Sequence, residues 1–343
     1  FPINQFMSQC IRNGEFPYWF NTWGMGFPLQ SNITWGVFST PRLFFSSVFN
    51  YNIYSLHIEL IFFICMAGWT MYSLLMKHFV KDKSIAVLLA ISYMLSGFIT
   101  GSTQWLLYIT AAAFIPLVLS SLLSLLRKPS VRTALQLSIV YTLMFTSVYA
   151  AFNVISTYII FFFTIAYLLN TKFDIHQKLK LVKYCFLTAG IILVLCGSAL
   201  LATIELMPYI ERGSSINNNT SFFESNYLHP KALLSSILPL PSAKMNFANT
   251  EGSMLNTYLG IFVMILLPSV FGKLNKENRK TIIALTIFAT LFLTTAFGSM
   301  TPVRNALNIL PGFSFFRNSA IFRLYFIICC ILLIATAYKN WNF

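Results

Sequence analysis

"QWLLYITAAAFIPLVLSSLLSLLRKPSVR" (residues 104–132) contains the pattern that decides the fold of this chain. Its first part, 104–126, has no charged side chain and is long enough to cross the hydrocarbon core of a bilayer, which takes about 20 mostly apolar residues. Arg127, Lys128 and Arg132 follow directly. An apolar run closed by a short basic connection indicates a membrane-spanning helix with a cytoplasmic loop.

The composition of the 343 residues agrees with this pattern, since 57% are hydrophobic and only 9% are charged. A soluble domain has about 25% charged residues, so we predict an all-α integral membrane protein, folded as a polytopic helical bundle. The net charge of +14 does not indicate a nucleic-acid partner, because the basic residues lie in short loops between apolar runs. The 6 cysteines form no CxxC or CxxH pattern, which argues against a disulfide framework or a zinc site.

Apolar runs recur along the chain and predict about nine spans. They lie at 55–76, 84–101, 104–126, 132–149, 151–169, 182–206, 255–272, 280–297 and 319–338. Every second connection is basic, and the basic residues concerned are Lys77, Lys81, Lys83, Arg127, Lys128, Arg132, Lys172, Lys178, Lys180, Lys183, Lys273, Lys276, Arg279, Lys280 and Lys339. The positive-inside rule makes that face cytoplasmic. The longer segments all fall on the opposite face, where function is therefore expected.

The predicted organisation follows the order of the chain. It comprises a first extracytoplasmic loop with interfacial helices at 1–54, a six-span bundle at 55–206, a large extracytoplasmic loop at 207–254, and a three-span C-terminal part at 255–343 with an outer loop at 298–318. Within the first loop we expect a short helix near 3–13 and an interfacial amphipathic helix at 40–49. Because residue 1 is Phe, we also expect that a further segment precedes it.

The stretch "GEFPYWFNTWGMGFPLQSN" (14–32) is rich in aromatic residues, glycine and proline. Trp and Tyr prefer the boundary between membrane and water, where the ring is buried and its polar tip stays hydrated. Trp19 and Trp23 suit that location. Two interpretations remain open: a structural aromatic collar, or one wall of a cleft that binds a lipid or a sugar.

Acidic residues are scarce, and six of them are expected on the outer face: Glu15, Glu59, Glu205, Glu211, Glu224 and Glu251. Ionisable groups at membrane depth are costly and are candidates for function. Glu205, with Glu211 and Arg212 close behind it, is predicted either to line a cavity or to form a Glu–Arg pair that only fixes the end of a span. Glu59 beside His57 suggests an interfacial pair that reaches toward water. Glu15 is expected to cap its loop.

The cationic counterpart is Arg304, Arg317 and Arg323, which lead into the last span. Arginine binds phosphate through two parallel hydrogen bonds. These three residues are therefore predicted either to hold the headgroup of a phosphate-bearing lipid or simply to contact lipid phosphates and helix ends. The chain lacks the GxxxxGK, HExxH, GxSxG and GxGxxG motifs, which argues against an ATP-driven pump, a metalloprotease and a serine hydrolase.

Four segments, in order along nearly the whole chain, resemble the bacterial YfhO-type family of polytopic membrane proteins. They are "IRNGEFPYWFNTWGMGFPL" (11–29), "IELMPYIERGSS" (204–215), "TYLGIFVMILL" (257–267) and "FGSMTPVRNALNILPGFSFFRNSAIFRLYF" (297–326). The last is similar to that family's "G-x-x-T-P … L-P-G-F-x-x-F-R" block and is the most specific of the four.

The resemblance implies a GT-C-like fold and a glycosyltransferase of a bacterial plasma membrane. Such enzymes transfer a sugar from a polyprenyl-phosphate donor to an envelope glycopolymer at the outer face. The family's catalytic acid would precede Phe1, on a tenth span, which leaves Glu15, Glu205 and Glu211 as weaker catalytic candidates. Substrate-binding candidates are Arg304, Arg317, Arg323, Arg212, Trp19 and Trp23. Some relatives use a divalent metal, although no ligand cluster is visible here.

Two other functions remain open. A lipid or glycolipid transporter or flippase would show internal repeats or interrupted pairs of spans around a midplane site, and no repeat is found. A non-catalytic subunit that supports another membrane enzyme would lack the acidic residue upstream of Phe1.

Overall fold

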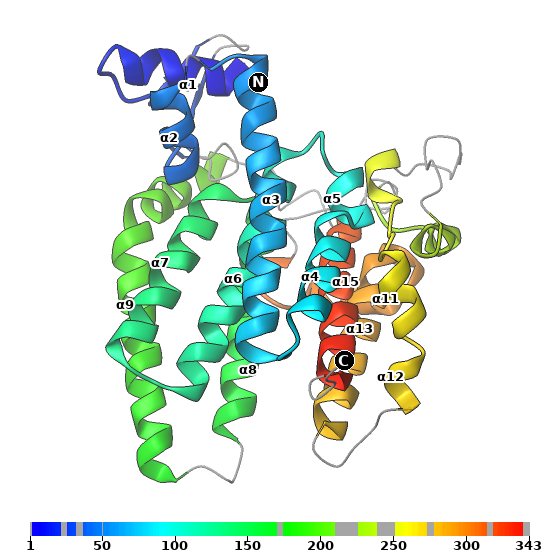
Figure 1. Cartoon of the computed structure of the whole chain (residues 1–343). Coiled ribbons are helices and arrows are strands. Elements are labelled where there is room, and N and C mark those ends of the chain that lie inside the picture. Colours follow the sequence, from blue (N-terminus) through cyan, green and yellow to red (C-terminus); the bar gives the residue numbers. More distant parts are fainter. Residues whose placement is uncertain are drawn as a thin grey trace. The chain divides into compact units, whose positions relative to one another are not determined.

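The computed structural model describes residues 2–21, 26–31, 37–49, 51–169, 174–209, 226–238, 251–272, 278–313 and 318–338. These residues are predominantly helical (Figure 1). Within them, one small antiparallel sheet pairs β1 (Trp19–Phe20) with β2 (Phe27–Pro28). The prediction of an all-α polytopic membrane protein is thereby confirmed in its coarse form.

All nine predicted spans contain helix. The corresponding elements are α3 (Ile53–His78), α4 (Lys83–Met94) with α5 (Gly97–Gly101), α6 (Leu106–Arg127), α7 (Val131–Ser147), α8 (Ala150–Leu168), α9 (Ile175–Leu206), α11 (Ile261–Leu266) with α12 (Ser269–Gly272), α13 (Arg279–Ala296), and η8 (Ser319–Ile321) with α15 (Phe322–Ala337). Two of these spans are interrupted. A break in the helix separates α4 from α5. In the span predicted at 255–272, residues 255–260 are not α-helical and α11 begins only at Ile261.

Seven helical segments in the described part of the chain are long and apolar enough to cross a membrane. Lys83–Gly101, which contains both α4 and α5, is counted as one of them, and so is Ser319–Ala337, which contains η8 and α15. Helix α7 has 17 residues and Ile261–Gly272 is a shorter apolar segment, so these two predicted spans do not reach the length of the others. The described residues thus have the long apolar helices of a multi-pass membrane protein, and the number of nine spans stays a prediction.

The chain divides into two compact units. Unit 1 comprises residues 1–63 and 114–211, and unit 2 comprises 64–113 and 212–343. The boundaries fall inside α3 and α6, so each unit combines segments that are distant in sequence. We describe each unit separately.

Unit 1 begins with the two helices expected in the first loop, α1 (Pro2–Arg12) and α2 (Thr40–Val48). The β1–β2 hairpin lies between them in the sequence, and its formation was not predicted. Ile3, Met7, Phe20, Leu29 and Val37 form a small core here, and the partly buried Phe27 of β2 and Leu43 of α2 pack against it. The aromatic stretch is therefore partly a folding element, because Phe20 is buried in this core while Trp19 remains exposed.

Local sequence signals fix the beginnings of several helices. The carboxylate of Asp82 caps α4 by accepting hydrogen bonds from the backbone of Ser84 and Ile85. Ser130 and Thr133 form a capping box at the start of α7. Both caps lie in connections predicted to be cytoplasmic, where they end a basic loop and start a span.

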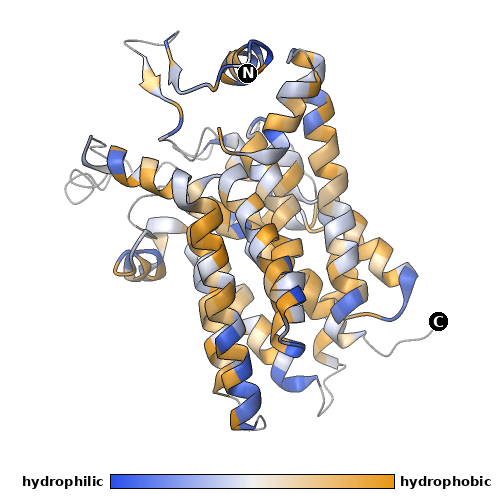
Figure 2. Ribbon diagram, turned by 90° about the vertical axis from the view of Figure 1, so that its left-hand side faces the viewer, coloured by the Kyte–Doolittle hydropathy of each residue, from blue (hydrophilic) through white to orange (hydrophobic). Residues whose placement is uncertain are grey.

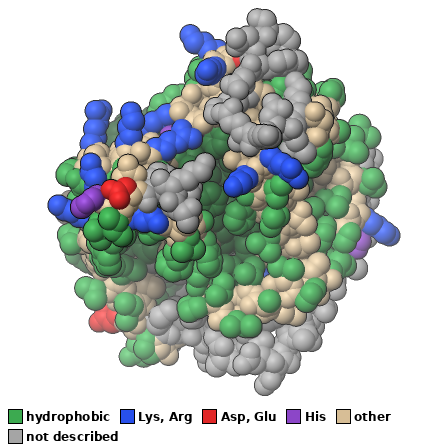
Figure 3. All heavy atoms as spheres, turned by 90° about the horizontal axis from the view of Figure 1, so that it is seen from below, with side chains coloured by type: hydrophobic (Ala, Val, Ile, Leu, Met, Phe, Trp, Pro, Cys, Tyr) green, Lys and Arg blue, Asp and Glu red, His purple; other side chains and the backbone are tan. Residues whose placement is uncertain are grey.

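Polar residues concentrate toward the ends of the long helices, and hydrophobic residues dominate their middle parts (Figure 2). Lys and Arg side chains gather on the face seen in Figure 3. In unit 2, 89% of the residues in an 18-residue window of the stretch 319–337 are buried within the protein, whereas in unit 1 only 17% are buried in the corresponding window of α9. An apolar helix with little protein cover has to face lipid, so α9 lies at the membrane-facing surface of unit 1.

Candidate functional site

Arg323 lies in the first turn of α15, at the end of the helix predicted to be extracytoplasmic. Its side chain is 0% exposed. The backbone just before it is held in place, since the N–H of Ala320 donates to the carbonyl of Asn226 at 3.2 Å. A buried guanidinium is costly unless its charge and its N–H groups are compensated, so the surroundings of Arg323 define the site.

Three segments of unit 2 supply that compensation. Nη2 of Arg323 donates to Oγ of Ser102 at 3.0 Å and to the carbonyl oxygen of Ser253 at 2.6 Å. The guanidinium carbon lies 5.1 Å from the centre of the Phe98 ring, which is within the range of a cation–π interaction. Arg323 thus joins α15 to the α5–α6 connection and to η5 (Gly252–Met254).

Two of the guanidinium nitrogens of Arg323 remain unsatisfied. Nε and Nη1 are buried and have no hydrogen-bond partner among the residues that the structure describes. A guanidinium has five N–H donors, and buried donors without a partner are rare enough in native proteins to require an explanation. An anion with several acceptor oxygens, such as a phosphate, has the opposite charge and can accept hydrogen bonds from such donors.

A carboxylate is connected to Arg323 through Ser253. Oε1 of Glu251 accepts hydrogen bonds from Oγ of Ser253 at 2.8 Å, from Nε1 of Trp105 at 3.1 Å and from Nε2 of Gln104. All three donors bind the same oxygen, so the orientation of the carboxylate is fixed. Within the described part of the chain, Oε2 of Glu251 receives no hydrogen bond.

Aromatic rings line the same region. The ring of Tyr108 stacks on that of Phe98, with 6.3 Å between their centres, and on that of Trp105, with 6.0 Å. Nδ2 of Asn318 donates to the Tyr108 hydroxyl at 2.7 Å. The charge of Arg323 interacts with both the Tyr108 hydroxyl and the Glu251 carboxylate. Since Trp105 is 45% exposed, the aromatic series extends from the buried guanidinium to the protein surface.

We call this group the Arg323–Glu251 cluster. It consists of Phe98, Ser102, Gln104, Trp105, Tyr108, Glu251, Ser253, Asn318 and Arg323.

The helix break between α4 and α5 brings the backbone of 255–260 close to this cluster. The N–H of Gly97 donates to the carbonyl of Tyr258 at 2.7 Å. A Cβ atom at Gly97 would lie 2.1 Å from Oδ1 of Asn256 and 2.3 Å from the backbone nitrogen of Tyr258. Only glycine permits this approach, so Gly97 determines where the segment that leads from Glu251 into α11 crosses the broken span.

Of the three arginines predicted to bind phosphate, Arg304 has a different environment. It lies on α14 (Pro302–Leu307) and is buried, and it donates to Oδ1 of Asn308 and, at 3.0 Å, to the carbonyl oxygen of Phe313. These bonds fold the loop that follows α14. Burial lowers the pKa of the Arg304 guanidinium to about 10, which leaves it charged at neutral pH.

The other predicted site residues are distributed over both units. Glu205 is exposed on α9 in unit 1, and Glu15 is exposed in the turn after α1, where its backbone N–H donates to the carbonyl of Cys10 at 2.9 Å. Trp19 is exposed on β1. Trp23, Glu211, Arg212 and Arg317 lie outside the described residues. Arg323 is therefore the predicted residue around which the described structure gathers further polar groups.

Glu59 and His57 do not form the expected interfacial pair, and that prediction is wrong. His57 is exposed while Glu59 is 1% exposed, because residues two positions apart point to nearly opposite sides of a helix. The Tyr51 hydroxyl donates to Oε2 of Glu59 and accepts a hydrogen bond from Nδ2 of Asn4 at 2.9 Å. Arg42 on α2 is also buried, and its charge interacts with Glu59.

Sequence reasoning placed Glu251 on the outer face but did not select it. Its partners lie about one hundred and fifty positions away along the chain, as the separations of 147 for Gln104 and 146 for Trp105 show. Nothing in the local sequence signals such pairing. Ser102 and Ser253 were missed for the same reason, because a serine in an apolar chain has no distinctive pattern.

Metal binding finds no support in the described part of the chain. No group of three or more His, Cys, Asp or Glu side chains there is arranged to hold a metal ion.

Comparison with known proteins adds no family assignment: no family model, no curated protein and no solved structure matches this chain.

Proposed function

We propose that this multi-pass membrane protein is a glycosyltransferase of the GT-C type. It would transfer a sugar from a polyprenyl-phosphate donor to a cell-envelope acceptor at the extracytoplasmic face of a bacterial plasma membrane. The observation that carries the proposal is Arg323, a fully buried arginine with two unsatisfied nitrogens in a cluster that also holds a carboxylate. The resemblance of four ordered segments to YfhO-type proteins is the second support.

Arg323 suits the phosphate of such a donor. Nε and Nη1 are the nitrogens of Arg323 that have no partner among the described residues, and both can donate hydrogen bonds to phosphate oxygens. When the bond between sugar and phosphate breaks, negative charge grows on the departing phosphate oxygen. Donors that are already fixed and shielded from water stabilise that charge without reorganisation, and the removal of one such donor typically slows an enzyme by about 10²–10³.

Glu251 suits the activation of an acceptor hydroxyl. Its Oε1 is held by three donors, while Oε2 remains available to accept a proton. In the reaction the acceptor oxygen would bond to the anomeric carbon and its proton would pass to Glu251. The bond from that carbon to the phosphate oxygen would break, and polyprenyl phosphate would leave with the electron pair. General base catalysis of this kind contributes about 10²–10⁴ in rate.

The position of the cluster fits a lipid donor with its headgroup at the membrane surface. Ser102, Trp105 and Glu251 belong to connections expected on the outer face. The α4–α5 break lies about 9 Å from the end of its span, at 1.5 Å per residue, and is therefore nearer to the interface than to the middle of a bilayer.

Purified full-length protein, reconstituted with a panel of polyprenyl-phosphate sugars, tests this function. We expect the release of polyprenyl phosphate, measured by mass spectrometry, and a loss of turnover in Arg323→Lys and Glu251→Gln. Arg279→Lys is the matched control, because Arg279 is exposed at the start of α13 in the same unit. Absence of turnover with every donor, or equal loss in the control, would contradict the proposal.

A transporter or flippase is a second candidate, favoured by the interruption of two predicted spans in unit 2. Irregular backbone at membrane depth often lines a substrate path. The two functions differ in their products, because transport leaves the donor intact. If Arg323→Lys abolished transbilayer movement of a labelled polyprenyl-phosphate sugar and no free polyprenyl phosphate were formed by the parent protein, transport would replace transfer as the proposal.

A further inference from the structure

A second polar site lies in unit 1, at the ends of α6, α7, α8 and α9 that are predicted to be cytoplasmic. A cavity of about 380 Å³ opens there between the α6–α7 connection and the facing ends of α8 and α9. It is lined by Leu126, Arg127, Lys128, Pro129, Ser130, Tyr167, Leu168, Gln177, Lys178, Lys180 and Leu181. Small-molecule sites commonly have volumes of about 300–1,000 Å³, so this one has room for a headgroup.

The charge of the lining is one-sided. Four of the lining residues are cationic, namely Arg127, Lys128, Lys178 and Lys180, and none of the described lining residues is acidic. Asp174 precedes α9 and is not among the lining residues, and its carboxylate accepts a hydrogen bond from the backbone N–H of Ile175 at 2.8 Å. Cations held around one cavity repel each other, so an anion bound between them would be favoured.

The helix ends themselves do not decide the sign of the potential. Helices α6 and α8 end at this cavity while α7 and α9 begin there, so their dipoles largely oppose one another. The positive potential therefore comes from the side chains. This matters for a test, because those side chains can be neutralised without disturbing any helix.

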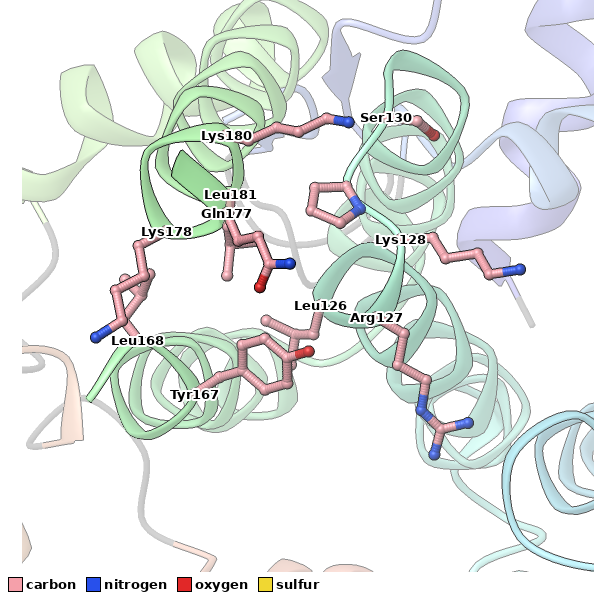
Figure 4. A pocket seen from close by; sticks show the side chains of 11 residues that line it. Leu126, Arg127, Lys128, Ser130, Tyr167, Leu168, Gln177, Lys178, Lys180 and Leu181 are labelled. Carbon is pink, nitrogen blue, oxygen red and sulfur yellow. The ribbon is translucent and has the colours of Figure 1, made fainter. Parts of the chain in front are cut away.

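Neutral hydrogen-bonding groups point into the cavity between the cations (Figure 4). The amide of Gln177 and the hydroxyl of Tyr167 point toward its centre, and Lys180 extends across it toward Ser130 (Figure 4). The charge of Arg127 acts on the Tyr167 hydroxyl. Lys128 and Lys178 lie at the rim, and lysine side chains are flexible enough to turn toward a bound anion.

The surroundings favour an anion that carries a lipid tail. Leu126, Leu168 and Leu181 provide an apolar floor. Farther along α9, Phe186 and Val194 are 75% and 81% exposed. The helix that carries Lys178 and Lys180 therefore also presents apolar side chains against which acyl chains can pack. Basic pockets between spans at the cytoplasmic side are typical sites for anionic lipid headgroups.

We propose that this cavity binds the phosphate headgroup of an anionic membrane lipid. The lysines and Arg127 neutralise the phosphate, while Gln177, Tyr167 and Ser130 provide donors for its oxygens. The site is independent of the function proposed for unit 2, and its test does not require turnover.

The experiment titrates short-chain phosphatidic acid and, separately, phosphatidylcholine into the purified full chain in a neutral detergent. Binding is followed by native mass spectrometry. The site variant is Lys178→Gln/Lys180→Gln. The control is Lys81→Gln/Lys83→Gln, which removes the same charge from an exposed loop predicted to lie on the same side of the membrane.

We expect preferential binding of phosphatidic acid. Each lysine near an anionic lipid contributes about a factor of five, so the site variant should bind about thirtyfold more weakly and the control within about threefold of the parent. Glycerol phosphate and inorganic phosphate form the soluble arms. Failure of both to displace the lipid supports a lipid source, and displacement at similar concentrations assigns the same phosphate site to a soluble ligand. Equal weakening in both double variants, or no preference over phosphatidylcholine, overturns the proposal.

Discussion

Each unit buries an arginine close to a carboxylate, yet the two surroundings differ. In unit 1, Arg42 lies in the field of Glu59, whose Oε2 accepts the Tyr51 hydroxyl. In unit 2, Arg323 is connected to Glu251 only through Ser253 and keeps two nitrogens without a partner among the described residues. In the first arrangement the opposite charge of Glu59 acts directly on the guanidinium, whereas in the second two guanidinium nitrogens have no partner among the described residues. The comparison teaches that burial of a charge alone does not identify a functional site.

Asn4, Arg42, Tyr51 and Glu59 form what we call the unit 1 group. The protonation states of its members support a structural role. Burial raises the pKa of the Tyr51 hydroxyl, and the Glu59 charge raises it further, so Tyr51 remains a donor at physiological pH. Burial also lowers the pKa of the Arg42 guanidinium, while Glu59 acts in the opposite direction. The Tyr51 hydroxyl thus bonds Glu59 and Asn4, and the opposite charges of Glu59 and Arg42 act on each other, where α1, α2 and α3 contribute these side chains.

The largest effect is expected from breaking the unit 1 group. Glu59→Leu removes the carboxylate and leaves Arg42 buried with an uncompensated charge, which typically costs about 3–5 kcal/mol. The midpoint of thermal unfolding of the purified protein in detergent measures this loss. The double variant Arg42→Met/Glu59→Leu removes both charges and should recover most of the stability. If Glu59→Leu unfolded at the parent temperature, Arg42 and Glu59 would not compensate each other.

The next prediction concerns turnover and distinguishes Arg323 from Arg42. Arg323→Lys keeps a positive charge but loses the planar set of donors. We expect a loss of about 10²–10³ in polyprenyl-phosphate release, by analogy with the removal of a donor that stabilises an oxyanion. Arg42→Lys is the matched change in unit 1 and should lower stability without lowering turnover per folded molecule. Equal losses of turnover in the two variants would remove the functional distinction between them.

The sequence predicted the helical elements well, because each span is an apolar run bounded by charged or turn residues. It also predicted α1 and α2 in the first loop. It missed the break between α4 and α5, since Ser96 and Gly97 are both tolerated inside a span and only contacts with Asn256 and Tyr258 show why the helix stops. It likewise missed the absence of α-helix at 255–260, an apolar stretch that could be helical on composition alone.

The candidate site was predictable only in part. Arg323 was selected because it leads into the last span and because arginine binds phosphate, and this argument needs no knowledge of contacts. Its partner Ser102 is 221 positions away, and Glu251 could not be distinguished from the other outer acids. Arg304 shows that the sequence can also select a residue whose side chain has another role. Its sequence context resembles that of Arg323, but its donors bind Asn308 and Phe313 in its own loop.

Gly97 links the broken span to the Arg323–Glu251 cluster, and its substitution tests whether that geometry matters. Gly97→Ala places a methyl group against Asn256 and the backbone of Tyr258, and overpacking of this kind costs about 1–3 kcal/mol. The unfolding midpoint should fall, and turnover should fall with it because the segment after Glu251 shifts. Gly190→Ala on α9 is the control, since a Cβ there meets nothing within 4 Å. A Gly97→Ala protein with parent stability and turnover would show that the close approach is not required.

The smallest changes remove one hydroxyl from each group. Tyr51→Phe deletes the hydroxyl that bonds Asn4 and Glu59, and Ser102→Ala deletes an acceptor of Arg323. A hydrogen bond to a charged group contributes about 1.5–3 kcal/mol, and a neutral one about 0.5–1.5 kcal/mol, so both variants should fold with modestly lowered unfolding midpoints. Only Ser102→Ala should reduce turnover per folded molecule, because it loosens the arginine that is proposed to hold the donor phosphate. If Tyr51→Phe reduced turnover equally at matched stability, the unit 1 group would have to belong to the functional site as well.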